Sequence, residues 1–353
     1  MIEGTDPIWN GRSVLITGHT GFKGAWLAWW LRSLGAEVIG YALPPALARQ
    51  NLFTMLDLQS VIDSRYGDVR DARTLASVIE SSRPEVIFHL AAQALVRPSY
   101  TDPRGTFDTN VVGTAILLDA VRMAPHVRAV VVVTSDKCYL NRGLTRGYRE
   151  DDPLGGADPY SASKAAQEIV SASYRQSFFS DGPLLATVRA GNVIGGGDWS
   201  PERLVPDIIA ALVSGSPVVL RYPDAVRPWQ HVLEPLHAYL KIGANLLNGE
   251  AMVADAWNIG PAASDQRTVR EIVERFAQIW DATSAWVRAD DVQPHEAMAL
   301  RLDAAKASSK LGIVPRLNLD AACEMTAHWY RSVTSGGNAR SLCDADIARF
   351  MAH

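Results

Sequence analysis

Hydrophobic residues in the first part of the chain fall in short unbroken runs, and amphipathic stretches separate these runs. Most runs lack the alternation of polar and apolar residues seen in half-exposed strands, which is typical of parallel strands covered on both faces. They predict strands at residues 13–17, 37–42, 64–69, 85–92, 129–135 and 184–191. The stretches between them predict helices that include 25–34, 71–81, 105–123 and 160–178. This alternation predicts an α/β fold with a doubly wound parallel sheet.

The pattern loosens after Gly191, where glycine and proline become frequent and helices such as 268–280 are scattered. A chain of 353 residues is also longer than one compact core usually requires. We therefore expect a first domain over residues 1–190, with returning segments near 228–260. A smaller mixed α/β domain is expected over 191–353.

Charge and cysteine content narrow the class of protein. There are 34 Lys and Arg against 38 Asp and Glu, a net charge of −4, without a basic block. This argues against nucleic acid as a partner, because phosphate backbones need a concentrated positive surface. Three scattered cysteines, Cys138, Cys323 and Cys343, do not suggest a disulfide framework. The N-terminus lacks a signal-peptide pattern and the apolar stretch 25–31 is too short to span a bilayer. A cytoplasmic protein without membrane attachment is expected.

A glycine-rich turn, Gly18–Gly24, lies between the first predicted strand and its helix. Glycines there allow a tight turn and let the backbone approach a pyrophosphate, while the helix N-terminus offers free N–H groups. A plain strand–helix turn is the simpler alternative, but the position after the first strand favours a Rossmann-type dinucleotide site. The residues expected to contact the cofactor in this turn are Gly18, Thr20, Gly21, Phe22, Lys23 and Gly24.

The end of the second strand lacks the acidic residue that usually holds the ribose 2′-OH of NAD. The sequence there is Gly40-Tyr41-Ala42-Leu43-Pro44, and no arginine for a 2′-phosphate is evident either. The residues alone therefore leave NAD and NADP both open. Asp68, after the third strand, is placed where a carboxylate meets the adenine amino group.

Tyr160 and Lys164 lie four residues apart at the start of a predicted helix, so both project from one face. A free tyrosine titrates near 10, but a nearby ammonium and a cationic nicotinamide ring both favour its phenolate. Such a tyrosine can take a hydroxyl proton while hydride leaves the same carbon. The spacing occurs by chance in many helices. Its place after five parallel strands and a nucleotide turn favours a catalytic pair.

Ser135, Asp136 and Lys137 end the fifth predicted strand. The carboxyl ends of parallel strands face the ligand crevice, so these side chains are placed for chemistry. A solvated junction between strand and loop is the alternative.

With these motifs located, the chain resembles the extended short-chain dehydrogenase/reductases, the NAD-dependent epimerase/dehydratase family, and within it the CDP-glucose 4,6-dehydratase subgroup. The resemblance runs over nearly the whole chain. Its more specific stretches are GHTGFKG at 18–24, SDKCY at 135–139, RAGNVIGGGDW at 189–199 and RPWQHVLEP at 227–235. A C-terminal pattern over 302–315 adds to it.

The resemblance implies a lyase that borrows NAD and returns it. Tyr160 takes the 4-OH proton while the C4 hydride passes to NAD, water is eliminated across C5 and C6, and the hydride returns to C6. Asp136 is implied as the acid for the leaving hydroxyl, Ser135 as a hydrogen-bond donor to the 4-oxygen, and Lys137 either as the C5 base or as an enolate stabiliser. Further cofactor contacts are implied at Val69, Ala91, Ala92 and Asn110.

For the substrate, the resemblance implies Asn192 and Arg227 as contacts to the CDP pyrophosphate, with Gln93 and His295 as weaker candidates. No metal is expected, since His231 and His237 lack further ligands nearby in the sequence. The resemblance also implies a homodimer through helices 105–123 and 160–178, and a product that feeds polysaccharide biosynthesis.

Three other functions are alternatives for a chain with these motifs. A sugar-nucleotide 4-epimerase needs the tyrosine and lysine but has no use for an acid at position 136. A carbonyl reductase would sustain net oxidation of the cofactor. A non-catalytic dinucleotide-binding protein would not need Tyr160 and Lys164. No residue reads cytosine by its chemistry, so CDP rests on the resemblance alone.

Overall fold

The structure, a computed structural model, describes residues 7–45, 50–201, 203–262, 265–282, 286–289 and 300–353. The chain divides into two compact units. The first consists of Met1–Leu140, Glu150–Ala190 and Leu236–Asn258, and the second of Asn141–Arg149, Gly191–Pro235 and Ile259–His353. The division of cofactor and substrate binding between two domains stays a prediction.

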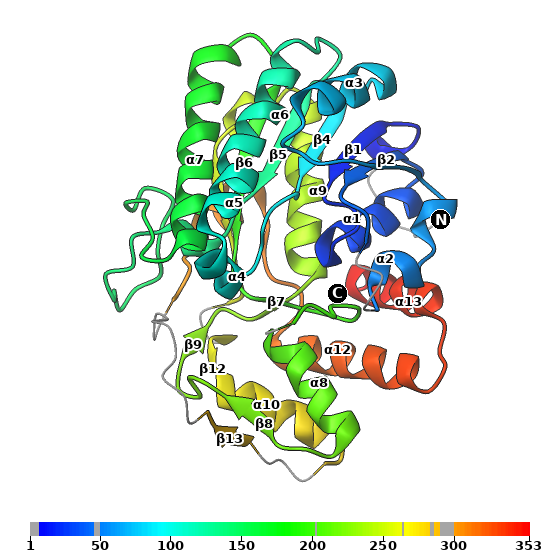
Figure 1. The fold of residues 1–353 in the computed structure, drawn as a ribbon, viewed down its shortest axis with the longest axis vertical. Coiled ribbons are helices and arrows are strands. Elements are labelled where there is room, and N and C mark those ends of the chain that lie inside the picture. The colour runs from blue at the N-terminus through cyan, green and yellow to red at the C-terminus, as the bar shows by residue number, and fades with distance from the viewer. Residues whose placement is uncertain (1–6, 46–49, 202, 263–264, 283–285, 290–299) are drawn as a thin grey trace. The chain divides into compact units, whose positions relative to one another are not determined.

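A seven-stranded sheet forms the centre of the first unit (Figure 1). Its strand order is β11-β6-β5-β4-β1-β2-β3. The strands are β1 (Ser13–Thr17), β2 (Glu37–Ala42), β3 (Asp63–Tyr66), β4 (Val86–His89), β5 (Ala129–Val133), β6 (Leu184–Ala190) and β11 (Ala256–Ile259). Strands β1 to β6 pair in parallel, and the order reverses between β1 and β4. A ligand crevice is expected outside the carboxyl ends at such a switch point.

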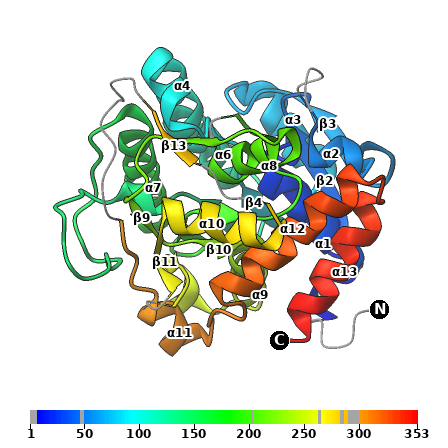
Figure 2. The same ribbon diagram turned by 90° about the horizontal axis from the view of Figure 1, so that it is seen from below.

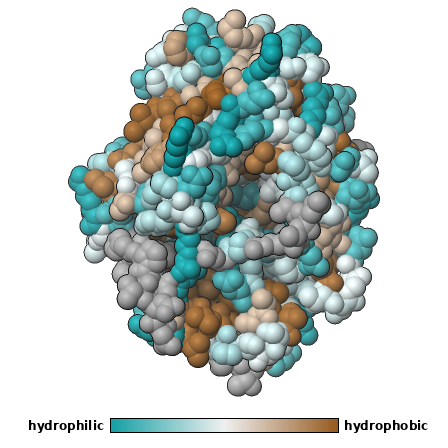
Figure 3. Space-filling view, viewed as in Figure 1, coloured by the Kyte–Doolittle hydropathy of each residue, from teal (hydrophilic) through white to brown (hydrophobic). Residues whose placement is uncertain are grey.

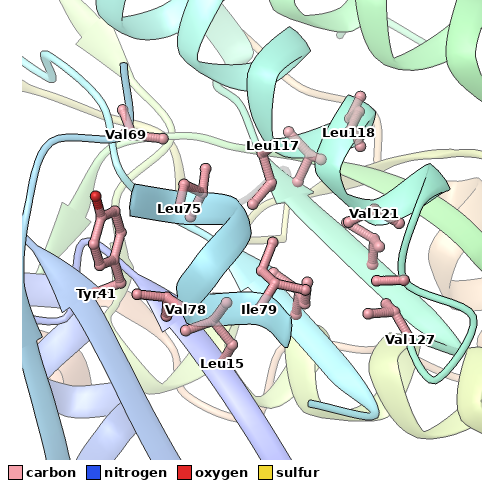
Figure 4. Close-up of a cluster of buried hydrophobic side chains, with 14 of the residues drawn as sticks. Leu15, Tyr41, Val69, Leu75, Val78, Ile79, Leu117, Leu118, Val121 and Val127 are labelled. Carbon is pink, nitrogen blue, oxygen red and sulfur yellow. The ribbon is translucent and has the colours of Figure 1, made fainter. Parts of the chain in front are cut away.

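One face of the sheet is covered by α3 (Ala72–Ser82), α6 (Gly113–Arg122) and α7 (Pro159–Phe178) (Figure 1). Helix α3 begins where the Asp71 side chain accepts a hydrogen bond from Thr74 N, which satisfies one of its free N–H groups. Buried side chains from α3 and α6 pack together above the strands (Figure 4). The residues labelled there are Leu15, Tyr41, Val69, Leu75, Val78, Ile79, Leu117, Leu118, Val121 and Val127.

The other face carries α1 (Phe22–Ser33) and α9 (Leu233–Leu247). Helix α1 is buried along its whole middle, from Gly24 to Leu31. A helix that is hydrophobic on all sides is typically buried on all sides, and here α9 supplies the second cover: Trp30 stacks on His237 at 6.4 Å between ring centroids. Helices on both faces confirm the predicted Rossmann-type α/β class.

The predicted helix 105–123 is wrong in its details. It is divided into α5 (Pro103–Phe107), a π-helical turn η3 (Asp108–Val112) and α6. Such π-turns often occur at functional sites. Here Asn110, at the centre of the turn, is drawn into hydrogen bonds with the backbone of Gln93, 17 residues earlier. This tertiary contact is not visible in the periodicity.

Several predicted strands are longer than the observed ones because their last residues turn into loops. The segment 64–69 contains only the end of β3, and 85–92 and 129–135 end as strands at His89 and Val133. The remaining elements of the first unit are η1 (Pro7–Trp9), α2 (Leu52–Met55), η2 (Leu58–Ser60), α4 (Val96–Thr101), η4 (Asp136–Cys138) and η5 (Ala251–Val253).

The second unit is a mixed α/β assembly of small sheets and helices. Its paired strands are β7 (Val193–Ile194) with β10 (Gln230–His231), β9 (Val226–Arg227) with β12 (Arg267–Thr268), and β8 (Val218–Leu220) with β13 (Trp286–Arg288). Its helices are α8 (Leu204–Ser214), α10 (Val269–Ile279), α11 (Ala305–Leu311), α12 (Leu319–Thr334) and α13 (Ala339–Met351). Helix α12 packs against α10 and α13 (Figure 2). Among all described helices, none has the length and apolarity to span a bilayer.

Candidate active site

The glycine turn is held by backbone packing. Gly18 has φ +79°, and a Cβ there would lie 2.8 Å from Ala91 N, because the turn crosses the loop that follows β4. A Cβ at Gly24 would lie 2.1 Å from Gly18 O. Glycine is therefore required at both positions by the fold of the turn itself.

Gly21 differs from these two glycines. Its φ of −82° suits any residue, and a Cβ would contact only Gly18 O, at 3.4 Å. Gly21 is exposed and is the N-cap of α1, which has no side-chain cap and no acidic residue in its first turn. An uncapped helix N-terminus with an open glycine above it fits a pyrophosphate that approaches the backbone closely. The turn therefore fits the phosphates of a dinucleotide.

The rim of this turn contains polar groups from three strand ends. Thr20 Oγ1 donates to Leu43 O at 3.0 Å, and Tyr41 Oη donates to Asp68 O at 2.9 Å. Asp68 forms an ion pair with Arg70 at 2.6 Å, and its hydrogen bonds with Arg70 lower the pKa of the carboxyl. Asp68 thus already has a partner, so a contact with adenine would add to this ion pair. Val69 beside it is buried.

His19, inside the glycine turn, has a position that the sequence did not suggest. The ring is fully buried, and a Cβ at Gly40 would lie 2.3 Å from it, so β2 needs glycine where it passes His19. Its Nε2 lies 2.7 Å from Ser64 Oγ on β3. Burial lowers the pKa of His19 to about 4, so the ring is neutral at pH 7.

Asn110 and Gln93 form a clamp beside α7. Asn110 Oδ1 accepts from Gln93 N at 2.8 Å, and Asn110 Nδ2 donates to Gln93 O and to Ser163 Oγ at 3.0 and 2.8 Å. The Gln93 side chain in turn bonds to Leu95 and Thr106. Both amides thus brace the loop that contains Ala91 and Ala92, and their predicted ligand contacts remain predictions.

Tyr160 and Lys164 lie at the start of α7, where Asp158 caps the helix by accepting from Ser161 N and Pro159 occupies the first turn. Both side chains are buried. Tyr160 N also donates to Ser99 Oγ at 3.1 Å. The predicted pair therefore lies on one helix, and the start of this helix is held by the Asp158 cap and by the hydrogen bond from Tyr160 N to Ser99.

Lys164 is the end of a buried chain of hydrogen bonds. Its Nζ donates to Gln167 Oε1 at 2.8 Å, and Gln167 Nε2 donates to Thr114 Oγ1 at 2.8 Å. Since Thr114 donates its own proton to Asn110 O, the His89 Nε2 at 3.0 Å must be the donor to Thr114.

His89 Nδ1 then accepts from Thr17 Oγ1 at 2.7 Å, directly before the glycine turn. This fixes the Nε2–H tautomer of a neutral ring. Burial and the charge of Lys164 lower the pKa of His89 to about 3, in agreement with that assignment. His89 and Gln167 were not singled out in the sequence, because only the fold brings them beside Lys164.

The pKa of Lys164 also differs from its usual value. Burial, followed by the nearby Lys23, lowers its pKa to about 7, while Glu168 opposes the shift. Lys23 Nζ donates to Tyr239 Oη at 3.4 Å, and the electrostatic influence of Tyr160 adds to the burial that raises the pKa of Tyr239. Lys23 is therefore close enough to act on Lys164, and Tyr239 of α9, which the sequence did not indicate, is close enough to interact with Tyr160.

The Ser135–Lys137 segment forms the 3-10 turn η4, which packs against α7. Ser135 is its N-cap, and its Oγ accepts from Lys137 N at 3.2 Å and donates to Asp136 Oδ1 at 3.0 Å. Asp136 is 2% exposed, whereas Lys137 is partly exposed. A solvated junction is thus wrong for Asp136: the carboxyl is buried next to the helix that carries Tyr160.

Of the predicted substrate residues, Asn192 and Arg227 belong to the second unit and Gln93 belongs to the first. Arg227 is buried on β9, where it pairs with β12, and Asn192 O accepts from Gln230 N at 3.0 Å. His295 lies outside the described residues. His231 is fully buried in the second unit. Among the residues with described placement, no group of three or more His, Cys, Asp or Glu side chains is arranged to hold a metal ion.

Comparison with known proteins places these features in a family. The family model described as GDP-mannose 4,6 dehydratase matches residues 15–326. A CDP-glucose 4,6-dehydratase of Salmonella typhimurium is 43% identical over 349 residues, which cover 97% of each chain.

Solved structures share the fold. DesIV, a dTDP-glucose 4,6-dehydratase of Streptomyces venezuelae solved with NAD bound, aligns with a TM-score of 0.78 at 25% identity over 93% of this chain and all of its own. A UDP-glucose 4-epimerase of Thermotoga maritima aligns with a TM-score of 0.79 at 21% identity over 92% of this chain and all of its own, which shows the fold alone. The family match over residues 15–326 and the 43% identical relative show that this chain belongs to the GDP-mannose 4,6 dehydratase family, among the extended short-chain dehydrogenase/reductases.

Proposed function

We propose that this protein dehydrates CDP-glucose to CDP-4-keto-6-deoxy-glucose, with NAD as a cofactor that is regenerated in each turnover. The observation that carries this proposal is the pairing of two functional groups in the first unit. Tyr160 and Lys164 lie on α7, and the buried acid Asp136 lies on η4, which packs against the same helix. The 43% identical CDP-glucose 4,6-dehydratase supports the choice of CDP-glucose.

NAD fits the glycine turn, where Gly18 and Gly24 shape the backbone and Gly21 leaves the N-terminus of α1 open. When bound, NAD supplies the temporary removal of a hydride from C4 and its return at C6, so the sugar nucleotide undergoes no net oxidation. We infer that the phosphates lie on the N–H groups of the turn, and that Thr20, Lys23 and Asp68 lie around the bound dinucleotide.

Tyr160 removes the proton of the sugar 4-OH, and the Lys164 ammonium stabilises the phenolate. The Ser135 hydroxyl, whose proton is donated to Asp136 Oδ1 in this structure, turns that proton to the 4-oxygen as it becomes a ketone. That ketone acidifies C5–H. Elimination then breaks the C5–H and C6–O bonds and forms the C5–C6 double bond, with Asp136 protonating the departing hydroxyl to release water. When hydride is returned to C6, a proton is added at C5, which gives the saturated 4-keto-6-deoxy sugar.

The C5 proton needs an acceptor, and Lys137 is the residue beside Asp136 that we place near it. A lysine acts as a base only when neutral; as an ammonium it stabilises the enolate instead. Lys137→Met with C5–H exchange into deuterated water separates these roles. Loss of exchange indicates the base, and retained exchange with slow water loss indicates the enolate stabiliser.

The decisive experiment incubates the protein and NAD with CDP-, UDP-, GDP- and dTDP-glucose and measures the product masses. We expect the loss of one water from CDP-glucose only. An unchanged mass with an inverted C4 would instead identify a 4-epimerase, and a steady loss of reduced cofactor with a ketone would identify a reductase. Asp136→Asn is expected to keep C4 oxidation and lose elimination; loss of both steps would contradict the assigned role.

We also propose a homodimer through the region of α5, η3, α6 and α7. Large apolar side chains are exposed on these elements or directly after α6: Phe107, Val112, Met123, Ile169 and Phe178. Met123 is 77% exposed and Ile169 59%, values typical of a surface that a partner covers. Figure 3 shows hydrophobic atoms gathered near α6 and α7, in its upper left. Sedimentation of the wild type and of Ile169→Glu tests this surface: the variant is expected to be monomeric.

The three cysteines are free and buried, which suits a reducing compartment, so we propose a cytoplasmic location. The proposed product is an activated 6-deoxy sugar, and we infer that it serves polysaccharide biosynthesis.

A further inference from the structure

A buried ion pair lies beneath the loop that carries Asp136. Glu168 of α7 and Arg189 of β6 are 3% and 4% exposed, and Glu168 Oε2 lies 2.8 Å from Arg189 Nη2. Burial works against the charge of Arg189, yet Glu168 beside it holds the pKa of the guanidinium above its usual value. Arg189 therefore keeps its positive charge beside the Glu168 side chain. A charged pair in the interior is costly unless its remaining hydrogen-bonding atoms have partners.

Two of the partners of this pair are the residues at the two ends of the loop; Thr187 and the carbonyl oxygen of Glu150 are others. Thr134 Oγ1, directly before Ser135, donates to Glu168 Oε1 at 2.5 Å. Tyr139 directly follows Cys138. Its Oη accepts from Arg189 Nη1 at 2.8 Å and donates to Asn258 Oδ1 of β11 at 2.6 Å. The segment Ser135–Cys138 therefore lies between Thr134 and Tyr139, and both of these residues are hydrogen-bonded to the same ion pair.

The same carboxylate also belongs to the helix of the redox pair. Glu168 follows Lys164 by one turn of α7, and its charge opposes the burial that lowers the pKa of Lys164. We propose that Glu168, with Arg189, is a positioning residue that fixes the acid Asp136 relative to Tyr160, and so couples the site of C4 oxidation to the site of water elimination. This inference rests on the proposed dehydratase function.

Two threonines provide a matched test. Thr134 and Thr187 are both buried, and both hydroxyls donate to Glu168, Thr134 to Oε1 and Thr187 to Oε2 at 2.8 Å. Thr134 adjoins the catalytic loop, whereas Thr187 lies within β6, where it pairs with Val132 of β5. Valine at either position removes one hydroxyl at nearly constant volume. Any difference between the variants therefore reports the loop and not the carboxylate.

The experiment compares Thr134→Val, Thr187→Val and Thr134→Ser in the full-length protein with CDP-glucose and NAD. Small misplacement of a catalytic group costs up to about 100-fold in rate. We expect kcat to fall about 10-fold or more in Thr134→Val with KM for CDP-glucose unchanged, and reduced nicotinamide to accumulate in a single turnover because elimination is slowed. Thr187→Val and Thr134→Ser are expected to stay close to the wild-type kcat.

A second measurement does not depend on turnover. Amide hydrogen exchange of residues 135–140 in the ligand-free protein is expected to be faster in Thr134→Val than in Thr187→Val. Equal exchange and equal kcat in the two valine variants would overturn the inference. A wild-type protein that releases no water from CDP-glucose would refute the proposed function instead, and the exchange experiment would still show whether the ion pair holds the loop.

Discussion

The glycine turn and the catalytic loop are both junctions at the carboxyl ends of parallel strands, yet they are held in different ways. The turn after β1 depends on absent side chains, since a Cβ at Gly18 or Gly24 would overlap backbone atoms. The loop after β5 depends on buried side chains, with Thr134 and Tyr139 bonded to the Glu168–Arg189 pair. A turn that presents N–H groups needs only its backbone shape, whereas a loop that presents an acid must fix a side chain.

The largest expected effect comes from removing the buried side chain that supports the catalytic loop. Glu168→Ala leaves the Arg189 charge buried without its carboxylate, which typically costs about 3–5 kcal/mol of unfolding free energy. We expect a loss of this size in urea unfolding. The double variant Glu168→Leu/Arg189→Met is expected to recover most of the stability, because no uncompensated charge remains, while turnover stays low. Recovery of turnover with stability would show that the pair serves the fold alone.

The next largest effect comes from a substitution that distorts the glycine turn. In Gly24→Ala the added methyl group would overlap Gly18 O, which is backbone and cannot rotate away. Overpacking of this kind costs about 1–3 kcal/mol. Thermal unfolding and NAD titration should both show a loss. Gly249→Ala is a control for glycine replacement in general, since its Cβ meets no atom within 4 Å, although its φ of +83° carries some strain. Unchanged NAD affinity in Gly24→Ala would contradict the role of the turn.

A third effect concerns the charge of Lys164, a residue that belongs neither to the glycine turn nor to the catalytic loop. Its pKa is lowered to about 7 from 10.5. Between these values the unfolded chain holds a proton that the folded chain lacks, so this group's contribution to stability rises with pH across the window. The slope is at most about 1.4 kcal/mol per pH unit. Urea unfolding of the wild type and Lys164→Met over this range should differ by such a slope; parallel curves would refute the shift.

The smallest expected effect on stability sharpens the comparison within the turn. Gly21 has an ordinary φ and an open Cβ direction, so Gly21→Ala should change the unfolding free energy by less than about 0.5 kcal/mol. NAD binding should nevertheless weaken about tenfold, because the methyl group occupies the approach to the helix N-terminus. Calorimetric titration with NAD measures this. Equal affinity in the variant would place the pyrophosphate elsewhere.

The sequence predicted best the helices and strands in which every residue has the same kind of surroundings, so that one local pattern describes the whole element. β1, β2 and α7 have the expected bounds within one or two residues, because continuous apolar runs and caps act locally. Helix 105–123 was predicted without its π-turn, since Asn110 takes its conformation from Gln93. β11 was not predicted as a strand of the central sheet because its short run, Ala256–Ile259, acquires its role only beside β6.

The sequence by itself determined the family, the parallel sheet, the glycine turn and the choice of Tyr160, Lys164 and Asp136 as candidates, because these depend on short motifs and on local periodicity. Only the tertiary structure decided what supports them. His89 reaches Lys164 through Thr114 and Gln167, and the Glu168–Arg189 pair reaches both ends of the catalytic loop, Glu168 through Thr134 and Arg189 through Tyr139. Such contacts join residues that are distant in the sequence, and a buried polar group has no sequence signature until the fold shows which partner satisfies it.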